Sequence, residues 1–529
     1  MNGLDYAIVA IYALGFLGLG YFFKENNSSK DYFLGGRSMG WFPLSLSTMA
    51  TQLSAISFIS APAFVGMKEN GGMKWLTYEF GVPIAMAIIM IFLIPTLYKA
   101  GIVSVYEYLE RRFNASTRLL ISFVFQLARS FATGVMVYAI ALILQSVLAI
   151  EFWQTILVIG VITMIYSFQG GMKAVIWGDV IQMLILFAGI ILCLIFGLNE
   201  LGGWGELTAK VDPTRIQTVD FSSFGFDGEG FGFWPMLFGG IFLYASYYGT
   251  DQTQSQRLLS SKDELTIKQL LTVNGLFRYP VTLVYCIMGL VLGTLLAEDP
   301  SYQLAIQETF EANRDSLNGP TDLLVPIFII KYLPHGIIGL LLVAILSAAM
   351  SSLSSAINSL SAVTMEDYVK RFNPNMDDAT YVRYSRLVSL AWGLICLFLA
   401  FFAGNIADTV IEAINKVSSA FSGPILAAFI LAIWSKRTTS LSVNIGILAG
   451  VAVNIYLWLF VPEVFWFWWN AIGFVVTAGL SLILNNFTGS PHKEFIKTEL
   501  AIDYQNLALL IGFFVVILMV SLSVPYWFG

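Results

Sequence analysis

The sequence predicts an all-α protein that crosses a membrane many times, and two observations carry this prediction. Hydrophobic residues make up 57% of the 529 residues and charged residues only 12%, half of the ~25% typical of soluble domains. Apolar runs of about 20 residues, long enough to cross a bilayer as helices, also recur from one end of the chain to the other. A transmembrane β-barrel would instead show shorter segments of alternating polarity. The composition therefore excludes a soluble enzyme, a disordered chain and a nucleic-acid-binding protein.

The apolar runs divide into fourteen predicted membrane spans, with boundaries good to a few residues. Two of these runs are longer than one crossing requires. The run 323–365 is expected to hold an interfacial or re-entrant helix before Pro334, and the run 117–148 to project beyond the bilayer. The spans are 4–23, 42–64, 75–97, 117–148, 152–168, 174–200, 232–249, 270–297, 323–365, 384–403, 408–434, 440–461, 465–485 and 503–524.

Lysine and arginine residues in the loops predict the orientation, because cytoplasmic loops are enriched in both. If the N-terminus lies outside, the inner loops carry 19 of these residues and the outer loops carry 5. The bias predicts an even number of crossings, with both termini outside. No GxxxxGKS or GxxxxGKT motif occurs, so an ATP-driven pump is not expected. The net charge of −6 gives no reason to expect nucleic acid as a partner.

Ionisable residues inside predicted spans are costly to place in a bilayer, so each is a functional candidate. Asp179 follows a Gly-Gly turn at 170–171 and is the best candidate for an unpaired carboxylate. Glu412 and Lys416 are one helical turn apart, so the structural alternative is that they pair and neutralise each other's charge. The candidates are Glu79, Arg129, Asp179, Arg278, Glu412 and Lys416, and Lys331 counts for less because it lies near the end of a span, where its side chain can reach the interface.

A serine-rich stretch at 348–358 is the most polar part of any predicted span. Close packing of small side chains would explain part of this pattern. Hydroxyl oxygens are also good ligands for a hard cation such as Na⁺, and a nearby carboxylate would balance the charge. The stretch therefore predicts a cation site in the membrane, with Asp179 beside it. Four polar residues at helical spacing share one face, namely Ser351, Ser354, Ser355 and Asn358.

Two spans carry helix-disfavouring residues at mid-membrane depth, and both are expected to be broken helices. The segment 45–57 is dense in hydroxyls with one amide, and Pro62 follows it. The segment 239–250 begins with two glycines and continues with serine and tyrosines. Interrupted segments at matching positions indicate an inverted repeat with a midplane site between its halves. Here the repeat would pair spans two to six with spans seven to eleven.

Several short motifs stand in a characteristic order, and together they resemble the sodium:solute symporter family. They are DYFLGGR at 31–37, YEYLERRF at 106–113, GGMKAVIWGDVIQ at 170–182, Gln256-Arg257, and the serine stretch with Asn358. The resemblance covers nearly the whole chain and implies a LeuT-type fold of two inverted five-helix repeats. It implies one transporter domain over 1–529, with repeats at 41–205 and 230–438, a flanking first helix at 1–40 and flanking C-terminal helices at 439–529. The implied activity is Na⁺-coupled symport by alternating access, not enzyme catalysis.

The resemblance implies Na⁺ as the coupling ion and two candidate sodium sites. The site shared across the family uses carbonyls of the first broken helix with a carbonyl and two hydroxyls of the serine helix. Its residues here are Ala50, Leu53, Ala348, Ser351 and Ser352. The second site, found in some members, combines a carboxylate with hydroxyls. Its residues here are Asp179, Ser351, Ser352, Ser354 and Ser355, so we expect two Na⁺ per cycle.

The family's substrate contacts point to a small polar organic solute. Galactose-type and sialate-type patterns are each kept in part, whereas 54–56 and 249–257 look more like the iodide, multivitamin and monocarboxylate branch, whose substrates are mostly anions. We therefore expect a small organic anion, monocarboxylate- or sialate-like, with Arg129 and Arg278 as carboxylate ligands. The similar positions are Gln52, Ser54, Ser57, Glu79, Arg129, Arg278 and Asn415, with Tyr247 resembling the inner aromatic gate.

Several alternatives stay open at the level of the sequence. A hexose is the alternative substrate, because Gln52, Glu79 and Asn415 supply sugar-like hydrogen bonds. Each arginine could instead pair with Glu79 or with a helix C-terminus. A proton-coupled symporter or a facilitator is a further alternative, whereas a membrane enzyme, a channel or a solute sensor fits less well. The expected location is the plasma membrane, or the inner membrane in a bacterium.

Overall fold

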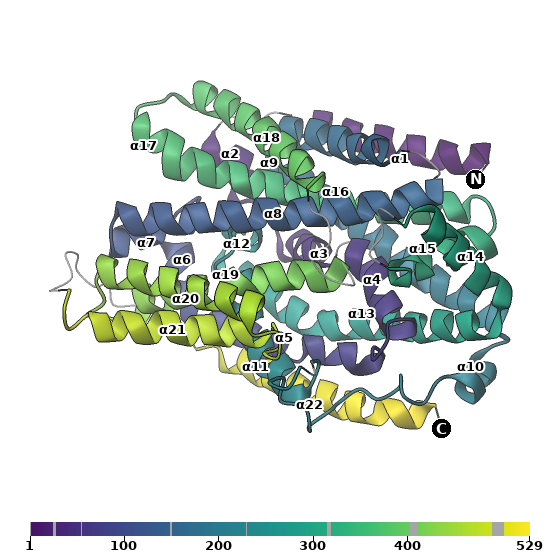
Figure 1. The fold of residues 1–529 in the computed structure, drawn as a ribbon. Coiled ribbons are helices and arrows are strands. Elements are labelled where there is room, and N and C mark those ends of the chain that lie inside the picture. Colours follow the sequence, from purple (N-terminus) through teal and green to yellow (C-terminus); the bar gives the residue numbers. More distant parts are fainter. Residues whose placement is uncertain are drawn as a thin grey trace.

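The computed structural model describes residues 2–24, 28–53, 55–148, 151–228, 230–314, 319–402, 410–488 and 502–528. Within these residues the regular structure is helical, apart from one isolated β-bridge between Met39 and Ser261. The long helices run side by side along one common direction, and the start of the first helix and the end of the last lie at the same end of the molecule (Figure 1). This arrangement is the one that an even number of crossings produces.

The helices before the first long loop are α1 (Gly3–Phe22), α2 (Ser29–Leu34), α3 (Trp41–Gln52), α4 (Ala55–Gly66), α5 (Gly81–Ile88), α6 (Ile94–Lys99), α7 (Glu107–Arg112), α8 (Ala115–Leu148), α9 (Phe152–Leu201) and α10 (Trp204–Lys210). Those after it are α11 (Phe233–Gly249), α12 (Gln252–Leu259), α13 (Glu264–Glu298), α14 (Pro300–Ala312), α15 (Leu324–Tyr332), α16 (Ile337–Val363), α17 (Lys370–Phe372), α18 (Asp378–Ala400), α19 (Val410–Trp434), α20 (Ser440–Phe460), α21 (Trp468–Leu484) and α22 (Tyr504–Ser523). Shorter helical turns are η1 (Gly35–Arg37), η2 (Met73–Glu79), η3 (Ile89–Leu93), η4 (Thr321–Leu323), η5 (Thr364–Val369) and η6 (Val524–Trp527).

Ten of the described helices are long and apolar enough to cross a membrane, or eleven if α3 and α4 form one bent span. The predicted multi-span helical fold is therefore confirmed, whereas the number fourteen stays a prediction. One reason for the smaller count is that α9 has 50 residues and contains two of the predicted spans. Its backbone turns at Gly171, whose φ of 56° suits glycine, and a Cβ there would come within 2.6 Å of the Tyr32 carbonyl oxygen.

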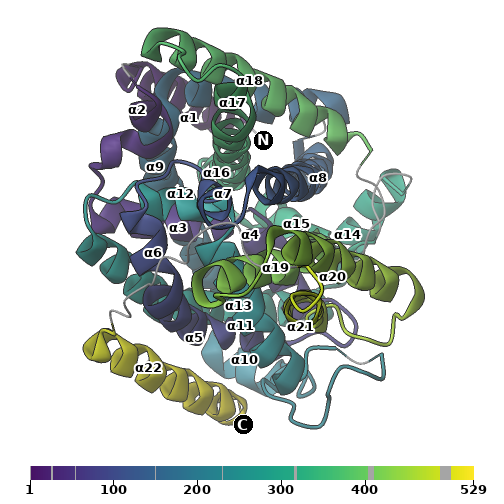
Figure 2. The same cartoon turned by 90° about the vertical axis from the view of Figure 1, so that its left-hand side faces the viewer.

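Both predicted broken helices are broken. The α3–α4 pair bends by 53° after Gln52, and α11 and α12 are separated by Thr250 and Asp251. In the end-on view, α3 and α12 lie near the middle of the molecule and α18 and α22 at its edges (Figure 2). The short helix α15 ends before Pro334 and α16 begins after it, as the sequence predicts for 323–365.

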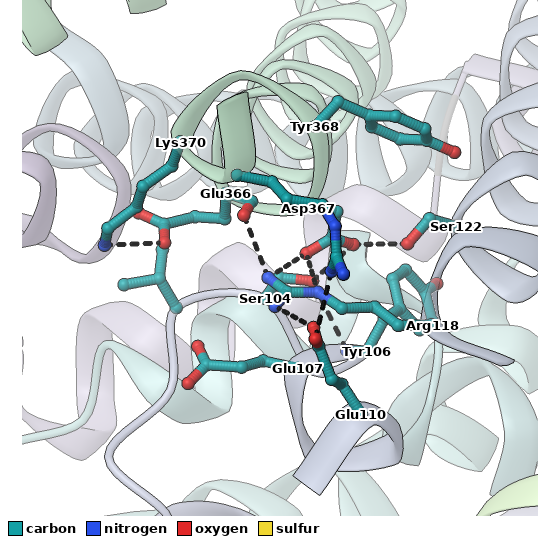
Figure 3. Close-up of polar contacts among 12 residues, drawn as sticks. Ser104, Tyr106, Glu107, Glu110, Arg118, Ser122, Glu366, Asp367, Tyr368 and Lys370 are labelled. Atoms are coloured by element: carbon teal, nitrogen blue, oxygen red, sulfur yellow. Dashed lines mark hydrogen bonds and ion pairs between the residues drawn. The ribbon is translucent and has the colours of Figure 1, made fainter. Parts of the chain in front are cut away.

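A buried ionic cluster ties α8 to the end of α16, at the end of the molecule opposite the termini (Figure 1). Asp367 lies in η5 and is fully buried. Its Oδ1 accepts hydrogen bonds from Arg118 at 2.8 and 2.5 Å, and its Oδ2 accepts from Ser104 at 3.0 Å and from Ser122 (Figure 3). Arg118 also donates to Glu110 at 2.9 Å. The cluster therefore fixes one end of the helix bundle.

Candidate functional site

Asp179 lies at the centre of the polar interior and is fully buried. Its Oδ1 accepts a hydrogen bond from Ser351 Oγ at 2.5 Å, and its Oδ2 accepts one from Ser47 Oγ at 2.5 Å. Ser47 belongs to α3 and Ser351 to α16. The carboxylate thus joins the first broken helix to the serine-rich helix, and the structure brings Asp179 and Ser351 together as the sequence predicts.

The prediction of an unpaired Asp179 is wrong, because Arg257 of α12 forms an ion pair with it. Arg257 Nη2 lies 2.7 Å from Asp179 Oδ2 and donates to Ser355 Oγ at 2.5 Å. Arg257 Nε donates to Ser47 Oγ at 2.7 Å. The arginine side chain is 1% exposed and the carboxylate 0%. The guanidinium therefore supplies the positive charge that a buried carboxylate requires.

The break between α3 and α4 and the serine-rich helix α16 face one another. Thr51 and Ser355 place their hydroxyl oxygens 3.4 Å apart across the two helices. Leu53 has φ −79° and ψ 71°, outside the helical range, at the end of α3. Ser352 Oγ is buried without a hydrogen-bond partner among the described residues. An unpartnered buried hydroxyl is costly on its own, so this oxygen is suited to a ligand.

A cavity of about 120 Å³ lies beside this break. Aromatic side chains form much of its wall, with Trp75 stacked on Tyr78 at a ring separation of 4.9 Å. Of the predicted substrate residues, Ser54 lies outside the described part of the chain and Glu79 is buried behind Arg278. The predicted residues that line the cavity are Gln52, Ser57, Arg129, Arg278 and Asn415, together with Ser352 and Tyr247.

Arg278 pairs with Glu79, which is the alternative to a role as a carboxylate ligand that the sequence left open. That alternative is confirmed in part. Arg278 Nη2 lies 2.6 Å from Glu79 Oε1, which also accepts a hydrogen bond from Thr282 at 3.0 Å. The arginine is 2% exposed and the glutamate 0%. Arg278 Nη1, however, is buried without a partner among the described residues. The pair is electrically neutral, yet one guanidinium donor of this cavity-lining side chain has no partner among the described residues.

Arg129 pairs with Asp251, a partner that the sequence did not indicate. Asp251 caps α12, and its Oδ1 accepts a hydrogen bond from the Thr253 amide at 2.8 Å. The guanidinium of Arg129 also lies over the Tyr247 ring, 5.5 Å from its centroid. A cation above an aromatic face is attracted to it. Arg129 therefore holds the predicted gate residue and the start of α12 together.

A smaller cavity of about 40 Å³ adjoins the main one, and Asp251 is part of its lining. Arg129 and Tyr247 line both cavities. The smaller cavity is also lined by Phe125 and Ile425, nearer the start of α8 and the end of α19 than the main cavity's lining. It therefore lies toward the end of the molecule opposite the termini.

On the other side of the main cavity, Glu412 pairs with Lys68 and not with Lys416 as expected. Lys68 Nζ lies 2.5 Å from Glu412 Oε2. Lys68 follows α4, and the loop there brings the ammonium group against the first turn of α19. Glu412 is one turn before Asn415, which lines the cavity. The Lys68–Glu412 pair therefore lies one helical turn away from the lining of the cavity.

Sequence reasoning missed Arg257, Ser47, Asp251 and Lys68. Arg257 stood in a quoted motif, and Asp251 in the stretch 249–257, but neither had an assigned role. Each pairs with a residue far away in sequence, 78 positions for Arg257 and Asp179 and 122 for Arg129 and Asp251. Contacts of that separation leave no signal in a single sequence.

Broken helices around a buried polar cavity, inside a bundle of membrane-length helices, define a helical membrane transporter. Comparison with known proteins narrows the class. The model of the sodium:solute symporter family matches residues 32–453. The chain belongs to this family. It is an integral multi-pass membrane transporter, not an enzyme, and Na⁺ is its coupling ion.

Individual relatives agree with this assignment. The sodium/iodide cotransporter of Homo sapiens is 30% identical over 471 residues, which are 86% of this chain and 69% of that protein. The sodium-dependent multivitamin transporter of Oryctolagus cuniculus is 30% identical over 488 residues, 90% of this chain and 71% of that protein. Sodium-coupled monocarboxylate transporter 1 of Xenopus laevis is 30% identical over 460 residues, 86% of this chain and 71% of that protein.

Solved structures share the fold. The substrate-bound, outward-open structure of a Na⁺-coupled sialic acid symporter matches with a TM-score of 0.81 at 24% identity, over 93% of this chain and 99% of that one. Mhp1, a nucleobase-cation-symport-1 family transporter, matches with a TM-score of 0.53 at 15% identity, over 87% of this chain and 94% of that one. These similarities support the fold assignment, but they do not identify the solute.

Proposed function

We propose that this protein imports a small organic anion of the monocarboxylate class together with two Na⁺ ions. The observation that carries the choice of solute is the buried guanidinium donor Nη1 of Arg278, which has no partner among the described residues and belongs to a side chain that lines the cavity. A carboxylate is the strongest complement to such a donor.

The size of the cavity supports a small solute. About 120 Å³ is below the ~300–1,000 Å³ of pockets for drug-sized ligands. A monocarboxylate of a few carbon atoms fits this space better than a sialate does. The relatives include proteins named for monocarboxylate, iodide and vitamin transport, of which the first two handle small anions.

The sugar alternative is less well supported by the polar contacts. Glu79 is the strongest acceptor that a sugar hydroxyl would use, but its carboxylate accepts from Arg278 and Thr282 and does not line the cavity. The carbonyl oxygens of Gln52 and Asn415 each accept a hydrogen bond from a tyrosine. The three acceptors on which the sugar alternative depends are thus each engaged at least once, which favours an anion.

For the first Na⁺ we propose the carbonyls of Ala50, Leu53 and Ala348 with the hydroxyls of Ser351 and Ser352. The unpartnered oxygen of Ser352 and the non-helical backbone at Leu53 support this choice. For the second Na⁺ we propose the Asp179 carboxylate with the hydroxyls of the serine helix. These residues are Ser351, Ser352, Ser354 and Ser355.

Alternating access would use two repeats, at 41–205 and 230–438, each of which contains one broken helix. The termini would lie outside the plasma membrane, so the cavity between Arg129 and Ile425 would open to the cytoplasm. Two Na⁺ and one monoanion move one net positive charge inward. Each such charge gains about 2.3 kcal/mol per 100 mV of membrane potential.

The test is thermal stabilisation of the purified protein by a panel of solutes, in NaCl and in KCl. A ligand that binds the folded state raises the melting temperature. Propionate, lactate and pyruvate should do so in NaCl only, whereas glucose, galactose and sialic acid should have little effect. Stabilisation by a hexose alone would favour the sugar symporter. Stabilisation that ignores the cation would favour a proton-coupled symporter or a facilitator.

A further inference from the structure

Helix α12 is an unusual element for the interior of a membrane protein. Its sequence QTQSQRLL is polar at the first six positions, and all eight residues are buried. Gln252 exchanges hydrogen bonds with the backbone of Val103 and Val105, and Gln256 donates to Asn358 Oδ1 at 2.6 Å. These bonds satisfy both glutamine side chains, whereas the one ionisable residue of the helix, Arg257, is a functional candidate.

The guanidinium of Arg257 contacts two oxygen groups assigned above to the second Na⁺. Its Nη2 contacts Asp179 Oδ2 at 2.7 Å and Ser355 Oγ at 2.5 Å. The remaining donor Nη1 bonds the Thr253 carbonyl of its own helix at 2.6 Å, so the side chain is anchored to α12. A charge-assisted set of bonds like this one is strong and specific in geometry.

We propose that Arg257 is a tethered cation that competes with the second Na⁺ for Asp179. This inference rests on the proposed function, because it concerns the second sodium site. Two cations on one buried carboxylate repel each other, so Na⁺ binds there only after the guanidinium has withdrawn. Because Nη1 is bonded within α12, withdrawal of the guanidinium moves or releases this helix.

The position of α12 makes the competition useful for coupling. Asp251 caps the helix and pairs with Arg129 beside Tyr247, at the wall between the two cavities. Binding of Na⁺ at Asp179 would therefore move or release α12 and so change the contacts at the cytoplasmic wall of the cavity. Arg257 is in this sense a positioning residue for the gate.

The experiment compares Na⁺ titrations of melting temperature for the purified full-length protein, at constant ionic strength with choline as the replacement cation. The variants are Arg257→Gln, Arg257→Lys and the double variant Asp179→Asn/Arg257→Gln. Arg257→Gln should be less stable without Na⁺, because Asp179 loses its partner. Its half-saturating Na⁺ concentration should fall by about tenfold or more, since the competing charge is gone.

The other variants separate competition from general damage. Arg257→Lys keeps a tethered charge and should show a half-saturating Na⁺ concentration close to that of the unmodified protein. The double variant should fold, because both charges are removed, and its Na⁺ titration should lose cooperativity and have a Hill slope near one. Arg118→Gln breaks a buried ion pair of the ionic cluster and should lower the melting temperature without changing Na⁺ affinity.

An equal or higher half-saturating Na⁺ concentration in Arg257→Gln would overturn the inference, since the arginine would then support Na⁺ binding. A double variant with the unmodified Hill slope would also overturn it, and this result decides the matter if Arg257→Gln does not fold. Failure of the proposed function gives a different result, in which the unmodified protein itself shows no stabilisation specific to Na⁺.

Discussion

Asp251 and Arg257 lie at opposite ends of one short helix, and each pairs with a different part of the molecule. Asp251 holds Arg129 beside the Tyr247 ring, and Arg257 holds Asp179 among the serines of α16. A helix of eight residues is about 12 Å long. The region around Asp179 proposed for the second Na⁺ and the wall between the two cavities are thus connected by one short helix.

The Arg129–Asp251 pair predicts a leak when it is broken. Asp251→Asn should weaken the wall between the two cavities and allow efflux of solute from loaded vesicles without Na⁺. Loss of one partner from this partly buried pair should also cost on the order of 2 kcal/mol of stability. Efflux of a preloaded radiolabelled monocarboxylate from proteoliposomes measures the leak. The double variant Arg129→Gln/Asp251→Asn should regain most of the lost stability, but it should still allow efflux of solute. A double variant whose loss of stability equals the sum of the two single losses would show that the two residues do not interact energetically.

Ser351 and Ser352 are neighbours with different contacts, so they form a matched pair. Ser351→Ala removes a hydrogen bond to a buried carboxylate and should cost about 1.5–3 kcal/mol of stability even without Na⁺. Ser352→Ala removes a hydroxyl without a partner among the described residues and should leave the Na⁺-free melting temperature unchanged. Both should weaken Na⁺ binding, which titration of melting temperature or of uptake would measure. Unaltered Na⁺ affinity in a stable Ser352→Ala variant would remove Ser352 from the proposed site.

Arg278 should discriminate between charged and neutral solutes. A single Arg278→Gln change leaves Glu79 buried without its main partner, at a cost of about 3–5 kcal/mol, so the better variant is Glu79→Gln/Arg278→Gln. Its apparent Kd for a monocarboxylate should rise at least tenfold, because a charged hydrogen bond worth about 1.5–3 kcal/mol is lost. Affinity for a neutral amide of the same size should change little. Equal losses for acid and amide would mean that the arginine only supports the cavity wall.

The ionic cluster around Asp367 should contribute to stability and not to ion binding. Asp367→Asn leaves Arg118 facing a neutral amide and should reduce stability by about 3 kcal/mol, with the same Na⁺ half-saturation as the unmodified protein. Arg314→Gln is the control, because it breaks an exposed pair with Glu311 and should change stability by less than about 0.5 kcal/mol. Chemical denaturation in detergent measures both. A shifted Na⁺ affinity in Asp367→Asn would give the cluster a role in transport.

Asp299 caps the start of α14, and we expect its titration to cause a pH dependence confined to this helix. Hydroxyl donors on Ser301 and Tyr332 hold the pKa of its carboxyl at about 2, below its ordinary value of 3.8. A depressed pKa stabilises the folded state above pH 3.8, and this contribution is lost as the pH falls toward 2. Hydrogen exchange of α14 amides, corrected for intrinsic rates, should accelerate as the pH falls from 3.8 toward 2. Asp299→Asn should show no such transition, and a transition that persisted there would belong to another group.

The fold class and the location of the site could be predicted from the sequence, because both depend on local patterns. Apolar runs mark the helices, and polar residues inside such runs mark the breaks after Gln52 and Gly249. The lining of the cavity by Gln52, Arg278 and Asn415 follows from the family pattern. The serine stretch likewise faces the interior, because its helical spacing puts the hydroxyls on one side.

The charge partners could not be predicted, because they depend on which helices meet. Asp179 looked unpaired only because Arg257 reaches it from another span. Lys416 looked like the partner of Glu412 because it is one turn away, yet Lys68 lies closer in space. For Arg278, pairing with Glu79 was one of two interpretations that the sequence left open, and only packing distinguishes them.

The polarity of α12 has a consequence for biogenesis. During synthesis α12 leaves the ribosome about 100 residues before Ser355, Asn358 and Ser359, the α16 residues that satisfy Arg257, Gln256 and Thr253. A segment with six polar side chains cannot partition into lipid alone. The nascent chain must therefore keep α12 in a hydrated or chaperoned environment until α16 has been inserted, so truncation before residue 355 should leave a protein that is retained by quality control rather than folded.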